Sequence, residues 1–115
     1  MKICFGILAI LFSLAACAQP PYLYYGNSSH SYYKAVKWHD DKSVAQYKQS
    51  LEDVFAKSTE LGKPVPPGLY CDYALLLLNE NKTVEAKQYF TKEMETWSES
   101  TPFITFLIQR YKVGN

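Results

Sequence analysis

From residue 43 onward, apolar residues recur every three or four positions, which is the spacing of an amphipathic helix. The first such stretch predicts a helix over residues 43–61, with apolar positions at Val44, Tyr47, Leu51, Val54, Phe55 and Leu61. Ser43 and Gln46 form a capping-box pattern at its start. Gly62 stands where a helix C-terminal cap belongs, so we expect the helix to end there.

A proline-rich segment, residues 63–68, separates this helix from a second one. Its three prolines within four positions cannot continue a helix. The second helix is predicted over residues 69–78, or from Pro66 or Pro67, since proline suits a first helical turn. Its four consecutive leucines, residues 75–78, make it apolar nearly all round, which predicts the central helix of the fold.

Two further helices are predicted, separated by short polar turns at residues 79–82 and 98–100. The third covers residues 83–97 with Thr83 as a plausible N-cap, and its buried stripe is Ala86, Tyr89, Phe90, Met94 and Trp97. The fourth covers residues 102–111 after Thr101 as N-cap, and it is expected to bury Phe103, Ile104, Leu107, Ile108 and Tyr111. Short connections imply antiparallel neighbours, so the expected fold class is all-α, a small antiparallel helical bundle.

The second and third helices have features of a tetratricopeptide-like helix hairpin. Ala74 and Ala86 match the small positions where the two helices of that repeat approach, and Phe90 matches its aromatic position. Glu93 and Ser98 depart from the Ala and Pro that are usual there. Any antiparallel helix pair produces a similar pattern, so both interpretations stay open.

The segment before the first helix, residues 17–42, is predicted to be an extended, irregular arm. Five of the ten tyrosines fall in it: Tyr22, Tyr24, Tyr25, Tyr32 and Tyr33. Its Ser and Asn content and Gly26 argue against a long helix before Ser31. Five tyrosines are too many for an inert linker, so we expect the arm to pack against the helical body or a partner. The alternative is an aromatic tether at the lipid headgroups.

The N-terminal residues have the layout of a bacterial lipoprotein signal. Lys2 is followed by an apolar run, residues 3–12, which is too short to span a bilayer. Residues 14–16 are Leu-Ala-Ala and precede Cys17, which matches a lipobox. Cleavage before Cys17 and attachment of acyl chains such as palmitate would anchor the protein to a membrane. The alternative is an ordinary secreted protein cut near Ala18.

These features divide the chain into a signal peptide at residues 1–16, the lipidated arm at 17–42 and a helical domain at 43–115. Ala18 stands where Asp would retain a lipoprotein in the inner membrane of enteric-type bacteria. The expected location is therefore the outer membrane, facing the periplasm.

Charge and cysteine content exclude several classes of function. Removing Lys2 with the signal leaves eleven basic and eleven acidic residues, which favours neither nucleic-acid binding nor a polybasic membrane contact. Cys4 is lost with the signal and Cys17 is acylated. Cys71 is then alone, so no internal disulfide can form.

The sequence contains little that predicts catalysis or a cofactor. His30 and the segment His39-Asp40-Asp41 could be read as metal ligands, but no other residues complete a metal spacing. Cys71 lies in the first turn of the predicted second helix, where the helix N-terminus could lower the pKa of its thiol and favour a nucleophile. Core packing is the more common role of such a cysteine. Acidic residues on the third helix and after it fit a solvated face: Glu93, Glu95 and Glu99. We therefore expect no enzyme and no cofactor.

Several short motifs together resemble a known family. They are Leu14-Ala15-Ala16-Cys17, Tyr24-Tyr25-Gly26-Asn27, Lys63-Pro64-Val65-Pro66-Pro67-Gly68-Leu69-Tyr70, Glu85-Ala86, Tyr89-Phe90, Lys92-Glu93 and Glu99-Ser100. In this order they resemble the small bacterial lipoproteins described as domain of unknown function 4810. Tyr25 and Ser98 depart from the Trp and Pro that are common in that pattern.

The resemblance implies a role by association, since such lipoproteins are commonly encoded beside a curli-type secretion-channel lipoprotein. It implies a non-enzymatic accessory subunit of an outer-membrane assembly that contacts this channel lipoprotein, and it supplies no catalytic residues. The expected contact surface is the tyrosine arm, residues 22–33, with the proline loop that contains Pro66 and Pro67. One alternative is a small-ligand or envelope-glycan binder whose cleft is lined by arm tyrosines. Another is an enzyme that uses a solvent-open Cys71.

Overall fold

The structure is a computed structural model that describes residues 22–114, and all regular secondary structure in this range is helical. Its elements are α2 (Ser28–Trp38), α3 (Asp41–Glu60), α4 (Leu69–Asn79), α5 (Thr83–Thr96), the short 3₁₀ helix η2 (Ser98–Ser100) and α6 (Thr101–Arg110). The prediction of an all-α fold is confirmed. The signal peptide and Cys17 lie outside the described residues, so the lipidation site stays a prediction.

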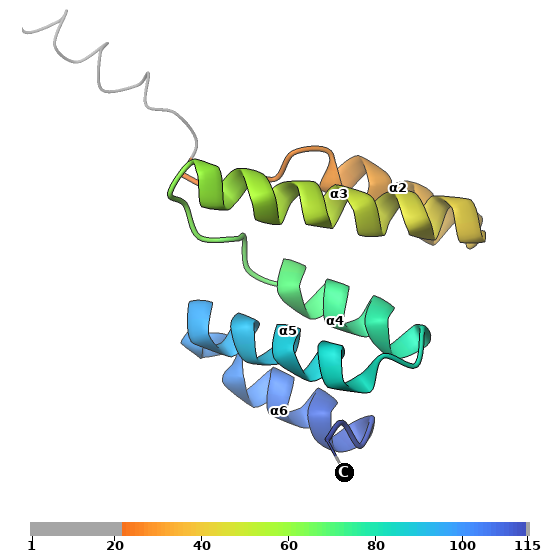
Figure 1. The fold of residues 1–115 in the computed structure, drawn as a ribbon. Helices are drawn as coiled ribbons and strands as arrows, with labels where there is room; N and C mark the ends of the chain where they lie inside the picture. The colour runs from red at the N-terminus through yellow and green to blue at the C-terminus, as the bar shows by residue number, and fades with distance from the viewer. Residues whose placement is uncertain (1–21, 115) are drawn as a thin grey trace, which may run out of the picture.

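The helices stack as antiparallel neighbours in the order in which they follow one another along the chain (Figure 1). The helices α2 and α3 form one hairpin, α4 and α5 form a second, and α6 packs on α5. The loop after α3 brings α4 back alongside it, so α4 lies between α3 and α5. This confirms the prediction that the leucine-rich helix is central.

The predicted extended arm is wrong for residues 28–38, which form α2. Ser28 begins the helix by donating two hydrogen bonds to the Tyr25 carbonyl oxygen, from its amide at 3.1 Å and its hydroxyl at 2.7 Å. Ser28 and Ser31 are buried, and α2 packs along α3. Small serine side chains allow this close approach, and tertiary packing forms the helix although its most buried positions are serines and not large apolar residues. Residues 22–27 remain outside any helix.

The start of α3 also differs from its prediction. Asp40, not Ser43, is the N-cap, and its Oδ1 accepts a hydrogen bond from the Ser43 amide at 2.6 Å. The helix therefore begins two residues earlier than expected, at Asp41. A carboxylate at this position also interacts favourably with the positive end of the helix dipole.

The end of α3 agrees with the predicted glycine cap. Gly62 has a φ of +64°, which side chains rarely adopt. The Lys63 amide donates to the Ser58 carbonyl at 2.9 Å and the Gly62 amide to that of Thr59 at 3.1 Å. This hydrogen-bond pair is a Schellman motif, which turns the chain out of the helix and into the proline loop.

The core runs through the stack, between α3 and α4, between α4 and α5, and between α5 and α6. Its most deeply buried members are Leu51, Val54, Ala74, Leu77, Ala86, Phe90 and Ile104. Either interpretation of the α4–α5 hairpin requires its alanines to be buried, so its tetratricopeptide-like character stays a prediction.

The buried stripe of α6 is narrower than predicted. Ile104 and Leu107 are buried, whereas Phe103 and Tyr111 are more than half exposed. The main contacts of α6 are with α5 and η2 on one side, so only a narrow stripe is covered. The expectation that Phe103 and Tyr111 join the core is wrong for this reason.

Candidate functional site

A cleft of about 200 Å³ opens between the start of α2, the first half of α3 and the start of α4. Its lining residues are Tyr25, Ser28, Ser29, Tyr32, Tyr47, Leu69 and Asp72. Two of the predicted partner-binding tyrosines, Tyr25 and Tyr32, are thus brought to the same site. We call this site the tyrosine cleft.

The walls of the tyrosine cleft are aromatic and open to solvent. Tyr25 is 45% exposed and Tyr32 is 51% exposed, although both line a concave surface. The Tyr32 ring meets the buried Tyr47 ring edge to face, with 5.4 Å between centroids and 61° between planes. The two hydrogen bonds from Ser28 hold the Tyr25 carbonyl group at the α2 N-terminus. The aromatic walls are therefore attached to two packed helices.

One acidic group lies among these aromatic rings. The Tyr47 hydroxyl donates a hydrogen bond of 2.5 Å to Asp72 Oδ2. Burial raises the pKa of Asp72, and the Tyr47 hydrogen bond only partly opposes this. Burial, followed by the interaction with Asp72, also raises the pKa of Tyr47, which keeps its phenol protonated. The cleft thus combines a neutral donor with a partly desolvated carboxyl group.

The other predicted contact residues are more scattered. Tyr22 and Tyr33 are exposed but do not line the cleft, and Tyr24 is half-buried. Pro66 is buried, whereas Pro67 is exposed. None of residues 63–68 of the proline loop lines the cleft, although Leu69, the first residue of α4, does.

Sequence reasoning missed Tyr47 and Asp72 as cleft residues. Tyr47 was assigned to the core, and its ring is indeed buried, but its hydroxyl reaches α4. Asp72 is the only Asp, Glu, Lys or Arg in the sequence of α4. A lone acid in an otherwise apolar helix is a signal that could have marked the site.

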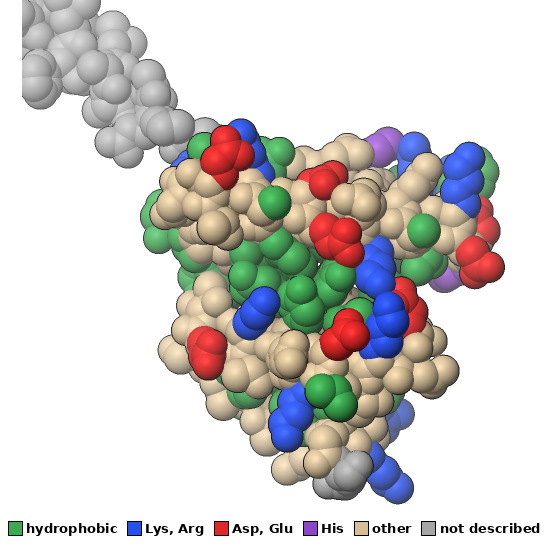
Figure 2. Space-filling model, in the orientation of Figure 1, with side chains coloured by type: hydrophobic (Ala, Val, Ile, Leu, Met, Phe, Trp, Pro, Cys, Tyr) green, Lys and Arg blue, Asp and Glu red, His purple; other side chains and the backbone are tan. Residues whose placement is uncertain are grey.

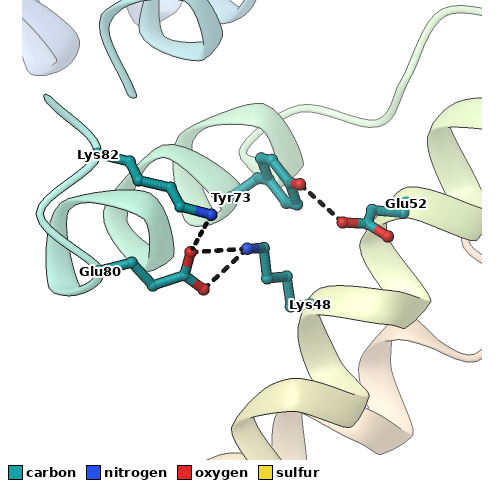
Figure 3. Close-up of polar contacts among 5 residues, drawn as sticks. All are labelled: Lys48, Glu52, Tyr73, Glu80 and Lys82. Atoms are coloured by element: carbon teal, nitrogen blue, oxygen red, sulfur yellow. Dashed lines mark hydrogen bonds and ion pairs between the residues drawn. The ribbon is translucent and has the colours of Figure 1, made fainter. Parts of the chain in front are cut away.

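A separate polar seam joins α3 to α4 away from the cleft (Figure 3). Glu80 accepts hydrogen bonds from Lys48 at 2.8 and 2.9 Å and pairs with Lys82 at 3.1 Å. Tyr73 donates to Glu52 at 2.7 Å. The two lysines lower the pKa of Glu80. This seam fixes the two hairpins against each other and offers no unpaired reactive group.

Four aromatic rings cover the junction of α3, α4 and α5, where Figure 2 shows hydrophobic side chains gathered between the two hairpins. They belong to Phe55, Tyr70, Tyr73 and Tyr89, with centroid separations from 4.5 to 6.0 Å. Lys92 Nζ lies 4.5 Å from the Tyr89 ring centroid. These rings pack on one another and make a cation–π contact with a lysine of the same chain, so they extend the core.

Cys71 does not present a solvent-open thiol. Its side chain is buried, and burial raises the pKa of the thiol to about 12. The thiolate, which is the nucleophilic form, is therefore suppressed at neutral pH. This placement contradicts the structural expectation of the Cys71 enzyme hypothesis and agrees with a packing role.

Glu93 is buried, which contradicts its assignment to a solvated face. It is 1% exposed, and its Oε1 accepts hydrogen bonds from the Gly68 amide at 2.7 Å and the Ser100 hydroxyl at 3.5 Å. Glu95 and Glu99 are exposed, as expected. Glu93 therefore ties α5 to the residue that precedes α4.

Residues 22–114 contain no group of three or more His, Cys, Asp or Glu side chains that could hold a metal ion. His39 and Asp40 instead form the connection between α2 and α3. None of the helices described in this range is long and apolar enough to cross a membrane.

Comparison with known proteins gives one result. A family model described as "Domain of unknown function (DUF4810)" matches residues 22–107, which is most of the chain. The matched range contains α2 to α5, part of α6 and every residue that lines the tyrosine cleft. Neither the comparison with curated proteins nor that with solved structures gives a match.

Proposed function

The chain belongs to the family described as domain of unknown function 4810, and we propose that it is a lipid-anchored envelope protein with a non-enzymatic, protein-binding role. The proposed anchor is Cys17, and the proposed location is the outer membrane, facing the periplasm. The partner that the family resemblance suggests is a curli-type secretion-channel lipoprotein, for which this chain would be an accessory subunit.

The observation that carries the binding role is the tyrosine cleft itself. Tyr25 and Tyr32 line a concave surface yet keep about half of their area exposed. Tyrosine is enriched at protein interfaces because it combines a large apolar ring with a polar tip and few rotatable bonds. Tyr22, Tyr33 and Trp38 add exposed aromatic area around the first hairpin.

The sequence distance to the proposed anchor supports a contact close to the membrane. Tyr22 follows Cys17 by five residues, which span at most roughly 18 Å when fully extended. The tyrosine cleft begins at Tyr25, so a lipidated Cys17 would hold it near the bilayer surface. A partner in the same membrane would then meet the cleft at a high local concentration.

Site-specific photo-crosslinking in intact cells tests this proposal. A photoreactive phenylalanine at position 32 is expected to give one discrete adduct with an envelope protein, identified by mass spectrometry. The same group at Gln88, on the exposed face of α5, is the matched control and should give no such adduct. Equal adducts from both positions, or none from position 32, would remove the cleft as the contact.

The anchor needs a test of its own. Mass spectrometry of the purified native protein should show an acylated Cys17 at its N-terminus. An unmodified Cys17, or an intact precursor, would contradict the lipoprotein assignment whatever the crosslinks show.

A second function, binding of a small envelope glycan, is favoured by one feature, the tyrosines that line the cleft. Trp38 and Trp97 do not line it, so quenching of their fluorescence would not report binding there. Ring-proton shifts of Tyr25 and Tyr32 in NMR spectra, followed during titration with cell-wall saccharides, are the suitable measurement. Saturable shifts would favour this function over protein binding.

A further inference from the structure

We propose that the tyrosine cleft is an aromatic cage for an alkylammonium group, and that its occupant is a lysine side chain presented by the partner protein. This inference rests on the proposed function, because it names the chemistry through which the partner is held. It follows from the lining residues, the size of the cleft and contacts elsewhere in the molecule.

The lining of the cleft matches the chemistry of cation recognition. Three of the lining residues, Tyr25, Tyr32 and Tyr47, are aromatic, and the negative face of an aromatic ring attracts an ammonium group. Asp72 contributes a carboxyl group, and the cleft has no Lys or Arg among its lining residues. The one lining residue that can carry a negative charge is therefore not opposed by a basic residue, and its charge attracts a cation.

The Asp72 carboxyl group keeps acceptor capacity for such an occupant. Tyr47 donates a single hydrogen bond to Oδ2, whereas an ionised carboxylate has about four lone-pair positions. Burial penalises the charged form of Asp72, which raises the pKa of its carboxyl group. A bound cation would offset that penalty, which gives the site a physical reason to favour positive charge.

The same chain already pairs tyrosine rings with lysine side chains. Lys92 Nζ lies 4.5 Å from the centroid of Tyr89, and Lys48 Nζ lies 5.6 Å from that of Tyr73. Both distances fall within the roughly 6 Å at which this attraction is significant. The tyrosine cleft offers the same partner groups, with an acid added, to a cation from outside.

The size of the cleft favours one side chain over a larger ligand. Its volume of about 200 Å³ is below the roughly 300–1,000 Å³ of pockets that enclose drug-sized molecules. A lysine stem is apolar, and Leu69 and the rings provide apolar surface for it. An ethanolamine lipid headgroup has the same ammonium group but carries a phosphate beside it, for which the cleft has no basic partner.

NMR titration of the mature lipidated protein in a nonionic maltoside detergent tests the inference. The probe is Nα-acetyl-lysine methylamide, and Nα-acetyl-norleucine methylamide is the matched control with the same stem length and no charge. We expect saturable shifts of the Tyr25 and Tyr32 ring protons with the lysine probe, and binding of the norleucine control at least roughly tenfold weaker. Equal binding of the two probes, or no saturation, would overturn the cage.

Variants locate the binding site. Asp72→Asn should weaken lysine-probe binding roughly tenfold, since it removes the charge but keeps an acceptor for Tyr47. Tyr25→Leu, outside any helix, provides a second test if the first variant folds poorly. Tyr111→Leu, exposed and outside the cleft, is the control and should bind as the unaltered protein does. Unchanged binding by folded Asp72→Asn or by Tyr25→Leu would contradict the proposal.

Three further outcomes of these experiments separate this inference from other ligands and from the proposed function. If glycerophosphoethanolamine binds as tightly as the lysine probe, the occupant is a lipid headgroup and the assignment to a protein lysine is wrong. If crosslinking at position 32 captures a partner but the lysine probe does not bind, the ligand chemistry fails while the proposed function stands. Probe binding without any crosslinked partner supports the cage and counts against the proposed protein-binding role.

Discussion

Phe90 and Phe103 offer a matched test of the fold, because their sequence patterns predicted burial for both and the structure buries only Phe90. Phe90 in α5 is 0% exposed and belongs to the central core, whereas Phe103 in α6 is 58% exposed. We therefore expect Phe90→Ala and Phe103→Ala to differ strongly in their effect on the free energy of unfolding.

The expected magnitudes follow from burial. Phe90→Ala removes a fully buried ring and leaves a cavity, which costs about 3–5 kcal/mol. Full burial of a Phe side chain contributes about 1.5–3 kcal/mol, so Phe103, with less than half of its area buried, should lose about 1 kcal/mol. A domain of this size has about 5–14 kcal/mol of stability in total, so Phe103→Ala should still fold, and Phe90→Ala should fold if the total exceeds about 5 kcal/mol.

Urea denaturation followed by far-UV circular dichroism measures both values. With a slope of about 1.5 kcal/mol per M, the midpoint should fall by about 2–3 M for Phe90→Ala and by less than about 1 M for Phe103→Ala. The slopes themselves should stay equal to that of the unaltered protein. Equal midpoint shifts for the two variants would refute the placement of α6 with its Phe103 face uncovered.

Three further predictions concern single polar or ionisable groups. Cys71 should react with iodoacetamide at pH 8 roughly a thousandfold more slowly in the native protein than in urea, because burial raises the pKa of its thiol to about 12. Similar rates in the two conditions would show that the thiol is open to solvent. Asp40→Ala should destabilise the protein at pH 7 by removing the acceptor for the Ser43 amide. The pKa of Asp40 is lowered in the folded state, so its contribution is complete above the ordinary Asp pKa and is lost as pH falls through the lowered value. Thermal unfolding of the variant and the unaltered protein should therefore converge in strong acid, and a constant difference would contradict the cap. Glu93→Ala should lower the free energy of unfolding, measured by urea denaturation, by about 2–3 kcal/mol. Glu93→Gln should lower it by less than half as much, since the Gln amide oxygen can still accept the hydrogen bond from Gly68. Equal losses would show that the hydrogen bond is not what stabilises this contact.

The helices α3 to α6 were predictable from the sequence because each has a local signal. Apolar residues at helical spacing, prolines that cannot lie within a helix and Gly62 at a cap position act within a few residues of chain. The start of α3 differed because Asp40 and Ser43 are both good N-cap residues, and only the formed hydrogen bond decides between them.

The helix α2 was missed because its buried face consists of serines. Ser28 and Ser31 give no apolar periodicity, and serine in isolation favours turns and caps. These residues become helical because α3 packs against them. A local sequence pattern cannot predict this contact, because it joins two separate segments of the chain. Tyr47 and Asp72 were missed as cleft residues for the same reason, since they meet across 25 positions of sequence.

The sequence by itself determined that this chain forms several short antiparallel helices and that its tyrosines gather near the N-terminus. These properties depend on local periodicity and composition, which are present before any tertiary contact forms. Only the tertiary structure decided which face of each helix is covered, and so which of two similar phenylalanines is core and which glutamate is buried. It also decided that Tyr25, Tyr32, Tyr47 and Asp72 share one cleft, because their proximity comes from the packing of three helices.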